Sequence, residues 1–321
     1  MHIPDVMMDA KTAVTTVALS AAGLALALRQ ARLHLPPRRV PLMGLAGAFV
    51  FAAQMLNFPV AAGTSGHLIG AVLCAILLGP SAAVVVLTAV LIVQCLMFSD
   101  GGVTALGANV FNMAVVGTLG GYAVYYLVSR SFKGLRGQVM AAAFAGWCST
   151  VLAAMACAGE LAMAGTLPWS KAFPAMAGIH MLIGLGEGLI TALALVAIAR
   201  TRPELLPETH PTPTPFRYGV AAVYGALISL GMAILLSPLA SPAPDGLEHV
   251  ADKLGFAEKP GDRPVLAAPI PDYKMPGVRS RTLATSLAGA AGTAVAFVLA
   301  LILSRVLVPR SQAIHTPAPS K

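Results

Sequence analysis

The chain has 321 residues, of which 57% are hydrophobic and only 11% are charged. Soluble globular domains carry a charge on roughly a quarter of their residues, so this composition excludes an ordinary soluble protein and indicates a protein embedded in a lipid bilayer. The formal net charge of +8 would suggest nucleic-acid binding in a soluble chain. Here basic loops on one membrane face explain it better, and we expect no nucleic-acid partner.

Nine apolar segments are candidates for crossing the membrane, which predicts an all-α polytopic protein with seven helices before a connector and two after it. A spanning helix needs about 20 predominantly apolar residues, and charged or Pro- and Gly-rich breaks separate the candidates. They are 12–28, 41–60, 67–79, 81–98, 107–128, 139–164, 173–199, 218–240 and 283–306. The third is short, so we expect it to be tilted, partly buried or re-entrant.

The distribution of charge predicts the orientation of the chain. The first segment follows Asp5 and Asp9 and precedes Arg29 and Arg32, the reverse of the charge order in a secretory signal. We interpret it as an anchor with the amino terminus outside the bacterial cytoplasmic (inner) membrane, and the basic residues of the short loops then fall inside. The outer face carries residues 1–11 and three further segments, 61–66, 99–106 and 241–282.

Changes in composition predict the domain organisation. We expect a seven-helix membrane domain over 1–200, a Pro-rich cytoplasmic linker over 201–217, a companion domain of two helices over 218–310, and a cytoplasmic tail over 311–321. Between the two late helices, the outer stretch 241–282 is expected to be a mobile loop that influences access to a site on that face.

Sequence motifs for ATP hydrolysis and for cysteine chemistry are absent. No Gly-Lys-Ser or Gly-Lys-Thr sequence completes a phosphate-binding loop, so the chain is not expected to hydrolyse ATP. The four cysteines lie in apolar stretches without a Cys-x-x-Cys pair, which favours buried hydrophobic side chains over a zinc site or a disulfide framework.

The first two residues, Met1 and His2, form a candidate chelator. The free amine of Met1, the backbone nitrogen of His2 and its ring nitrogen can close fused five- and six-membered rings around one ion. A planar nitrogen set suits Ni(II) and Cu(II), and imidazole suits Ni, Cu and Zn. His67 lies on the same predicted outer face and would supply a fourth nitrogen. The alternatives are a solvated His2 and a His67 that hydrogen-bonds a neighbouring helix. Two imidazoles and a free amine on the same face favour a metal site over these alternatives.

Three polar residues near the outer ends of the spans could orient these ligands. Asp100 lies in an outer loop, and Asn109 and Asn112 lie three residues apart on one predicted helical face. One interpretation is that they hold His67 or the amino-terminal segment, since metal-bound imidazoles usually donate their other N–H to a polar partner. The alternative is helix capping by Asp100 and interhelical bonding by the asparagines.

Ionisable residues also occur within the seventh predicted span. His180 and Glu187 lie two helical turns apart, on one face, and such groups usually face a bundle interior. A role in a conformational relay or in a partner contact is one interpretation, but we favour an internal hydrogen-bonded pair. Glu160 is expected near the outer interface, where it would be solvated.

Five motifs together resemble the cobalt/nickel substrate-capture subunit of energy-coupling-factor (ECF) transporters. Four of them lie within about residues 1–200, and the fifth, Pro-Asp-Gly-Leu-Glu, resembles the small companion subunit, here fused to the first. The motifs are Met1–Asp5, Gly63–Gly70, Asp100–Met113, His180–Glu187 and Pro244–Glu248. Val6 departs from the family pattern, which usually has glycine there, so the turn after the chelator could differ.

The resemblance implies the substrate-binding component of an ABC-type transporter that imports Ni(II) or Co(II). It implies a metal held by the Met1 amine, the His2 backbone and ring nitrogens and the His67 ring, with the metal as cargo and no resident cofactor. It also implies two kinds of partner, a transmembrane coupling subunit and cytoplasmic ATP-binding subunits. The sequence does not distinguish cobalt from nickel.

One enzyme class offers a rival interpretation. Ser65 within Gly-Thr-Ser-Gly, together with His180, superficially resembles the serine and histidine of rhomboid-like intramembrane proteases. The glycines after His180 have the wrong spacing, and the serine lies on too early a span. We therefore expect a transporter component rather than an enzyme.

Overall fold

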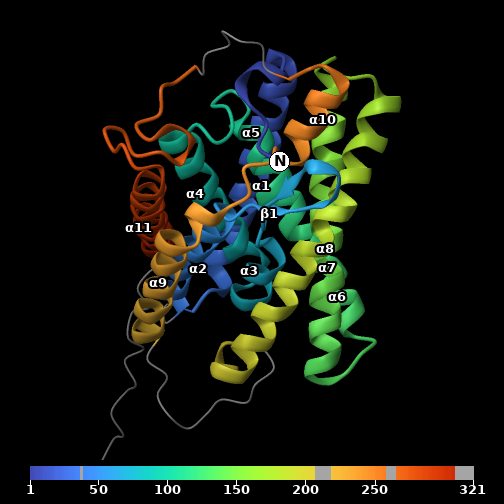
Figure 1. Cartoon of the computed structure of the whole chain (residues 1–321). Helices are drawn as coiled ribbons and strands as arrows, with labels where there is room; N and C mark the ends of the chain where they lie inside the picture. The colour runs from blue at the N-terminus through green and yellow to red at the C-terminus, as the bar shows by residue number, and fades with distance from the viewer. Residues whose placement is uncertain (37–38, 207–217, 258–264, 308–321) are drawn as a thin grey trace, which may run out of the picture.

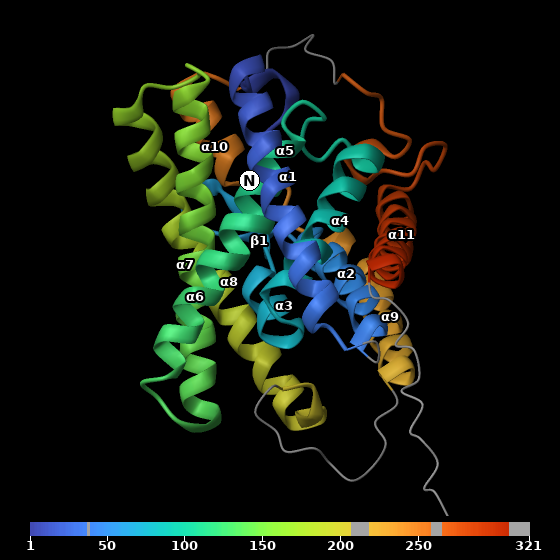
Figure 2. The same cartoon turned by 180° about the vertical axis from the view of Figure 1, so that it is seen from behind.

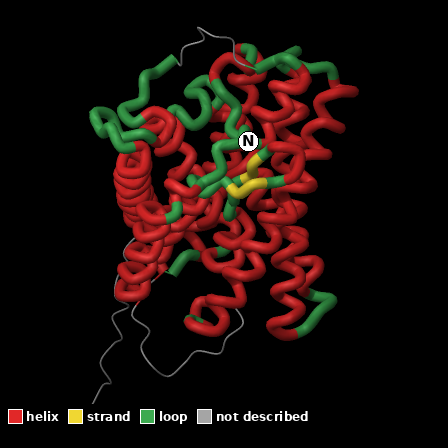
Figure 3. The backbone as a smooth tube through the Cα atoms, viewed as in Figure 1, coloured by secondary structure: helices red, strands yellow, loops and turns green. Residues whose placement is uncertain are grey.

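The computed structural model describes residues 1–36, 39–206, 218–257 and 265–307. Over these ranges the chain is mainly helical, with two short strands (Figure 3). The prediction of an all-α polytopic membrane protein is confirmed, because seven described helical segments are long and apolar enough to cross a membrane. These are Ala10–His34, Pro80–Phe98, Leu106–Ser129, Gly134–Met163, Trp169–Thr201, Gly219–Leu239 and Arg281–Val306. The predicted tail 311–321, and all but the first six residues of the linker 201–217, lie outside the described residues.

The long helices follow from continuous apolar runs that end at polar or glycine-containing breaks. They are α1 (Ala10–His34), α4 (Pro80–Phe98), α6 (Gly117–Ser129), α7 (Gly134–Met163), α8 (Trp169–Thr201), α9 (Tyr218–Leu235) and α11 (Arg281–Leu307). At the start of α1, the Asp9 carboxylate accepts hydrogen bonds from the backbone N–H groups of Lys11 and Thr12, which satisfies donors that a helix leaves unpaired. Ahead of α6 lie α5 (Leu106–Asn109) and a π-helical turn, η4 (Val110–Val116).

Two predicted spans form shorter helices than expected. Segment 41–60 contains α2 (Val40–Gln54), and segment 67–79 contains α3 (Ala71–Leu78). The chain leaves α2 to make an antiparallel hairpin from β1 (Phe58–Pro59) and β2 (Ser65–Gly66). Helix α3 begins only after Gly70, whose φ of +75° favours glycine. Apolar composition alone did not reveal this turn.

Helices α9 and α11 pack against α2 on one side of the molecule, while α6, α7 and α8 form the opposite side (Figures 1 and 2). Small residues allow the α2–α11 contact. A Cβ added at Gly47 would lie 2.8 Å from the Cβ of Ala300, so the two backbones approach more closely than larger side chains would permit.

The amino terminus is buried inside the molecule, close to β1 and beneath α10 (Gly246–Leu254) (Figure 1). Ile3 is fully buried, and its backbone N–H and C=O are both bonded by the Asn109 amide, at 2.7 and 3.1 Å. Gly102 N–H also donates to the Ile3 carbonyl at 2.9 Å. Val6 lies in a short 3-10 turn, η1 (Asp5–Met7), and is not among the residues with positive φ. The turn therefore does not require glycine at this position.

The sequence predicted a mobile outer loop over 241–282, but the described part of this segment contains a helix and a 3-10 turn. Helix α10 is amphipathic and packs against α8, and a 3-10 turn, η7 (Pro271–Tyr273), packs against α4. Asp245 and Glu248 form a capping box at the start of α10, in which each side chain bonds a backbone N–H near the other. Local capping and packing thus give this polar segment a defined structure.

Candidate metal centre

The Met1 amine and the His67 ring lie side by side in the interior. The amine nitrogen is 3.1 Å from Nε2 of His67, and both residues are buried. Nδ1 of His67 lies 3.3 Å from the carbonyl of Leu68, which can only accept, so Nδ1 carries the proton and Nε2 presents a lone pair to the amine. Two nitrogens bound at right angles to one metal ion, each at about 2.0–2.1 Å, would be about 2.9 Å apart. The observed separation is therefore close to that of two adjacent ligands.

The His2 ring completes the cluster. It stacks on the His67 ring with 5.3 Å between the ring centroids. Its Nδ1, the nitrogen that can close a six-membered chelate ring with the backbone, lies 3.0 Å from Oδ1 of Asp100. Its Nε2 lies 3.2 Å from Oε1 of Gln94, whose own amide donates to Gln54 at 2.7 Å. Metal binding through Nδ1 would thus replace the contact with Asp100.

Asp245, like Gln94, is a residue of this site that the sequence did not predict. Its Oδ2 forms an ion pair with the Met1 amine, while its Oδ1 accepts the N–H groups of Leu247 and Glu248 at the start of α10. The sequence showed Asp245 only as part of a motif 244 positions away from Met1. One feature of the sequence could have indicated this contact. Asp245 is an acidic residue in a segment predicted to lie on the same outer face as the free amine.

Burial and the Asp245 charge set the protonation of the site. Burial lowers the pKa of His67 to about 3, and the nearby amine adds to this effect. Burial also lowers the pKa of His2, against the opposing influence of Asp100. Burial acts to lower the pKa of the Met1 amine, but the Asp245 carboxylate outweighs it, so this pKa is raised. Near neutral pH the site holds two neutral imidazoles beside a protonated amine that is paired with a carboxylate.

A cavity of about 240 Å³ borders both histidine rings. Tyr273 of η7 lines it, stacks on Phe98 with ring centroids 4.6 Å apart, and donates a hydrogen bond to Oδ2 of Asp100 at 2.5 Å. Four carboxylates line the same cavity: Asp100, Asp245, Glu248 and Asp272. The same cavity therefore places carboxylates, which attract a divalent cation, beside the two imidazole rings.

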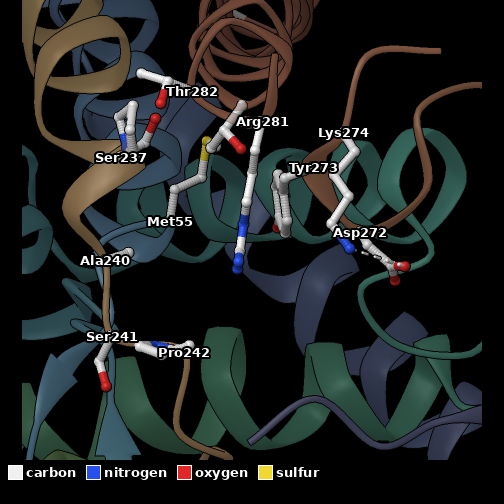
Figure 4. A pocket seen from close by; sticks show the side chains of 12 residues that line it. Met55, Ser237, Ala240, Ser241, Pro242, Asp272, Tyr273, Lys274, Arg281 and Thr282 are labelled. Atoms are coloured by element: carbon white, nitrogen blue, oxygen red, sulfur yellow. Dashed lines mark ion pairs between the residues drawn. The ribbon is translucent and has the colours of Figure 1, made fainter. Parts of the chain in front are cut away.

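A neighbouring cavity of about 190 Å³ shares Met55, Asp272 and Tyr273 with the first. Arg281, at the start of α11, extends into it between Met55 and Tyr273 (Figure 4). Asp272 pairs with Lys274 at 3.8 Å (Figure 4). The part of the chain that follows the linker therefore supplies several of the side chains that surround the approach to the histidines.

The structure separates the three predicted orienting residues. Asp100 contacts His2, and Asn109 holds the backbone of Ile3. Asn112 instead donates to Oε2 of Glu160 at 2.6 Å and is not brought to the amine and histidine cluster. Glu160 is only 2% exposed, which corrects the expectation that it is solvated. It lies on α7, where its side chain turns inward to Asn112.

The expected hydrogen-bonded pair between His180 and Glu187 is wrong. Glu187 accepts the backbone N–H groups of Ile69 and Gly70 at 2.6 and 2.9 Å, and so it holds the loop that follows His67. His180 donates from Nδ1 to the carbonyl of Met176 at 2.8 Å. The two side chains share a face of α8 but serve different partners, because a nearby loop offers Glu187 two backbone donors.

The rival protease arrangement has no supporting contact in the described chain. Ser65 donates its hydroxyl to the Ala243 carbonyl at 2.7 Å, and no hydrogen bond joins it to His180. Among the described residues, no three His, Cys, Asp or Glu side chains gather as a metal cluster. The nitrogen donors that do meet are two histidine rings and a backbone terminus, the Met1 amine.

The chain has clear similarity to known transport proteins. It matches the family described as cobalt uptake substrate-specific transmembrane region over residues 2–205 and the PDGLE domain over residues 220–309. It is 36% identical to a putative fused nickel transport protein NikMN of Archaeoglobus fulgidus over 308 residues, which cover 95% of this chain and 98% of that protein. It is 33% identical over 327 residues to the fused nickel transport protein NikMN of Rhodobacter capsulatus, covering 92% and 94% of the two chains.

A solved structure agrees with these sequence relatives. A crystal structure of a truncated transition metal transporter is similar with a TM-score of 0.57 and 34% identity, over 62% of this chain and 99% of that one. The chain therefore belongs to the family of the cobalt uptake substrate-specific transmembrane region, carries a fused PDGLE domain, and is a multi-pass membrane component of metal transport.

Proposed function

We propose that this protein is the substrate-binding component of an ECF-type transporter that imports Ni(II) or Co(II). The metal is held by four nitrogens, the Met1 amine, the His2 backbone and ring, and the His67 ring. The observation that carries this proposal is the 3.1 Å approach of the buried amine to Nε2 of His67. Relatives described as nickel and cobalt transport proteins support the choice of metals.

We also propose how the protein is oriented in the membrane, which subunits it works with and how its two parts divide the task. The amino terminus faces the outside of the cytoplasmic (inner) membrane, and a transmembrane coupling subunit with cytoplasmic ATP-binding subunits supplies the energy. Residues 1–200 capture the metal, and residues 218–310 form the companion domain, whose Asp245 and Tyr273 contact the capture site. The carboxylate-lined cavity supports entry from the side of the site where α10 and η7 lie.

The site predicts a pH dependence of metal binding. The amine must lose the proton that faces His67 before it can bind a metal, and its pKa is raised above the ordinary value. The His2 backbone nitrogen must likewise release its N–H proton before it can bind. Protons therefore compete with the metal across the neutral range, and affinity falls as the pH is lowered, by about tenfold per pH unit for each proton released. Calorimetry of the untagged protein with Ni(II) and Co(II) between pH 8 and pH 5 measures this. An affinity that stays flat over this range would contradict the scheme.

Asp245→Asn, measured by the same calorimetry, separates the effect of the Asp245 charge on the amine from its role as the cap of α10. Asparagine also caps helices, so α10 keeps its cap, but the amine loses the carboxylate that raises its pKa. The pH dependence of metal binding should therefore move to lower pH. Asp272→Asn removes an exposed carboxylate that pairs with Lys274 and should leave the profile in place. An unshifted profile for Asp245→Asn would show that Asp245 does not control the amine.

A further inference from the structure

His180 has a buried ring nitrogen without a hydrogen-bond partner among the described residues. The residue is 1% exposed, and its Nε2 makes no hydrogen bond within the described chain. Because the Met176 carbonyl accepts from Nδ1, the ring is the tautomer with its proton on Nδ1, and Nε2 carries a lone pair. A buried acceptor without a donor is costly. This lone pair therefore needs a donor.

A small cavity joins His180 to the amino terminus. It has a volume of about 10 Å³ and is lined by residues that include Met1, His67, His180 and Asp245, which is room for about one water molecule among polar groups. Gly246 helps to keep Nε2 accessible, because a Cβ at this position would lie 2.7 Å from that nitrogen. The first residue of α10 thus leaves space where a larger residue would cover the ring.

The Met1 amine has a donor to offer to this cavity. A protonated amine carries three N–H groups, and the contacts with His67 Nε2 and Asp245 Oδ2 account for two of them. We propose that the cavity binds one water molecule that accepts the third N–H and donates to Nε2 of His180, and that His180 thereby positions the amino-terminal ligand. This inference rests on the proposed function and adds a residue that holds the metal-binding amine.

The arrangement directs the amine toward His67. When a metal ion replaces the proton between Met1 and His67, the amine keeps two N–H groups, and these remain bonded to Asp245 and to the water. The lone pair then points at the position between the amine and Nε2 of His67. Because Glu187 on the same face of α8 holds the loop after His67, this single helix orients both ligands, one through Glu187 and the other through His180.

Variants that differ only in the acceptor at position 180 test this inference. His180→Phe keeps a ring of similar size without an acceptor, and His180→Gln restores an acceptor at a similar reach. Thr191→Val is a matched control, since Thr191 is a fully buried residue of α8 whose hydroxyl has no partner in the part of the chain that the structure describes, and it does not line the cavity. His180→Leu, which also lacks an acceptor, is measured in parallel. It replaces the phenylalanine variant if that variant does not fold.

Calorimetry of the untagged full-length proteins with Ni(II) gives the readout. We expect His180→Phe and His180→Leu to bind roughly 10-fold to 100-fold more weakly, the usual effect of losing a group that orients a ligand. His180→Gln and Thr191→Val should bind close to wild type. Wild-type affinity in His180→Phe would overturn this inference, and so would a His180→Gln variant that binds as weakly as His180→Phe. Neither result would contradict the proposed function. A wild-type chain that bound no Ni(II) or Co(II) would instead contradict the proposed function.

Discussion

Adding one residue before Met1 should abolish tight binding of Ni(II) and Co(II). The extension converts the primary amine of Met1 into an amide, which could bind a metal only after losing its own N–H proton, and it also removes the ammonium group that pairs with Asp245. Because Met1 is only 4% exposed, the buried space around the amine leaves little room for an added residue. Isothermal titration calorimetry of the extended and native proteins measures the loss.

A residue added after Lys321 is the matched control for this experiment, since it changes the chain length by the same amount but leaves the Met1 amine unmodified. Thermal unfolding of both extended proteins shows whether the fold is retained. If the amino-terminally extended protein bound either metal as tightly as the native chain, the amine of Met1 would not be a ligand.

His67→Ala should have the second large effect. It removes the imidazole that faces the amine at 3.1 Å, and the loss of a direct ligand should exceed the roughly 10-fold to 100-fold weakening typical of losing a residue that orients one. His34→Ala provides a control, because His34 is an exposed histidine at the end of α1. Metal affinity by calorimetry should fall only in the first variant. Equal affinity in both would place the metal elsewhere.

Much of the fold could be predicted from the sequence because long apolar helices leave a strong compositional signal. The signal failed where the chain between Gln54 and Ala71 is apolar but forms no α-helix. The last part of this stretch, residues 64–70, is buried inside the protein, and its backbone polar groups find internal partners, such as the carboxylate of Glu187 for the N–H groups of Ile69 and Gly70. Irregular backbone at such a depth is tolerated for this reason, and composition cannot detect it.

The candidate site was predictable only in part, because its members are distant in sequence. Met1 and His2 are adjacent, so their chelating chemistry is local and visible. The contact with Asp245 depends on the placement of α10 against α8. Likewise, two asparagines three residues apart could not be told apart by spacing, yet Asn109 holds Ile3 and Asn112 holds Glu160. Tertiary packing, rather than helical periodicity, decides which of them serves the site.

X-ray absorption spectroscopy of the untagged, nickel-loaded protein tests the proposed ligand set most directly. The amine, the His2 backbone and ring nitrogens and the His67 ring predict a first shell of nitrogen only, with outer-shell scattering from two imidazole rings. A first shell that contained sulfur, or one made of oxygen alone, would contradict the assignment of the metal to the amino terminus and His67.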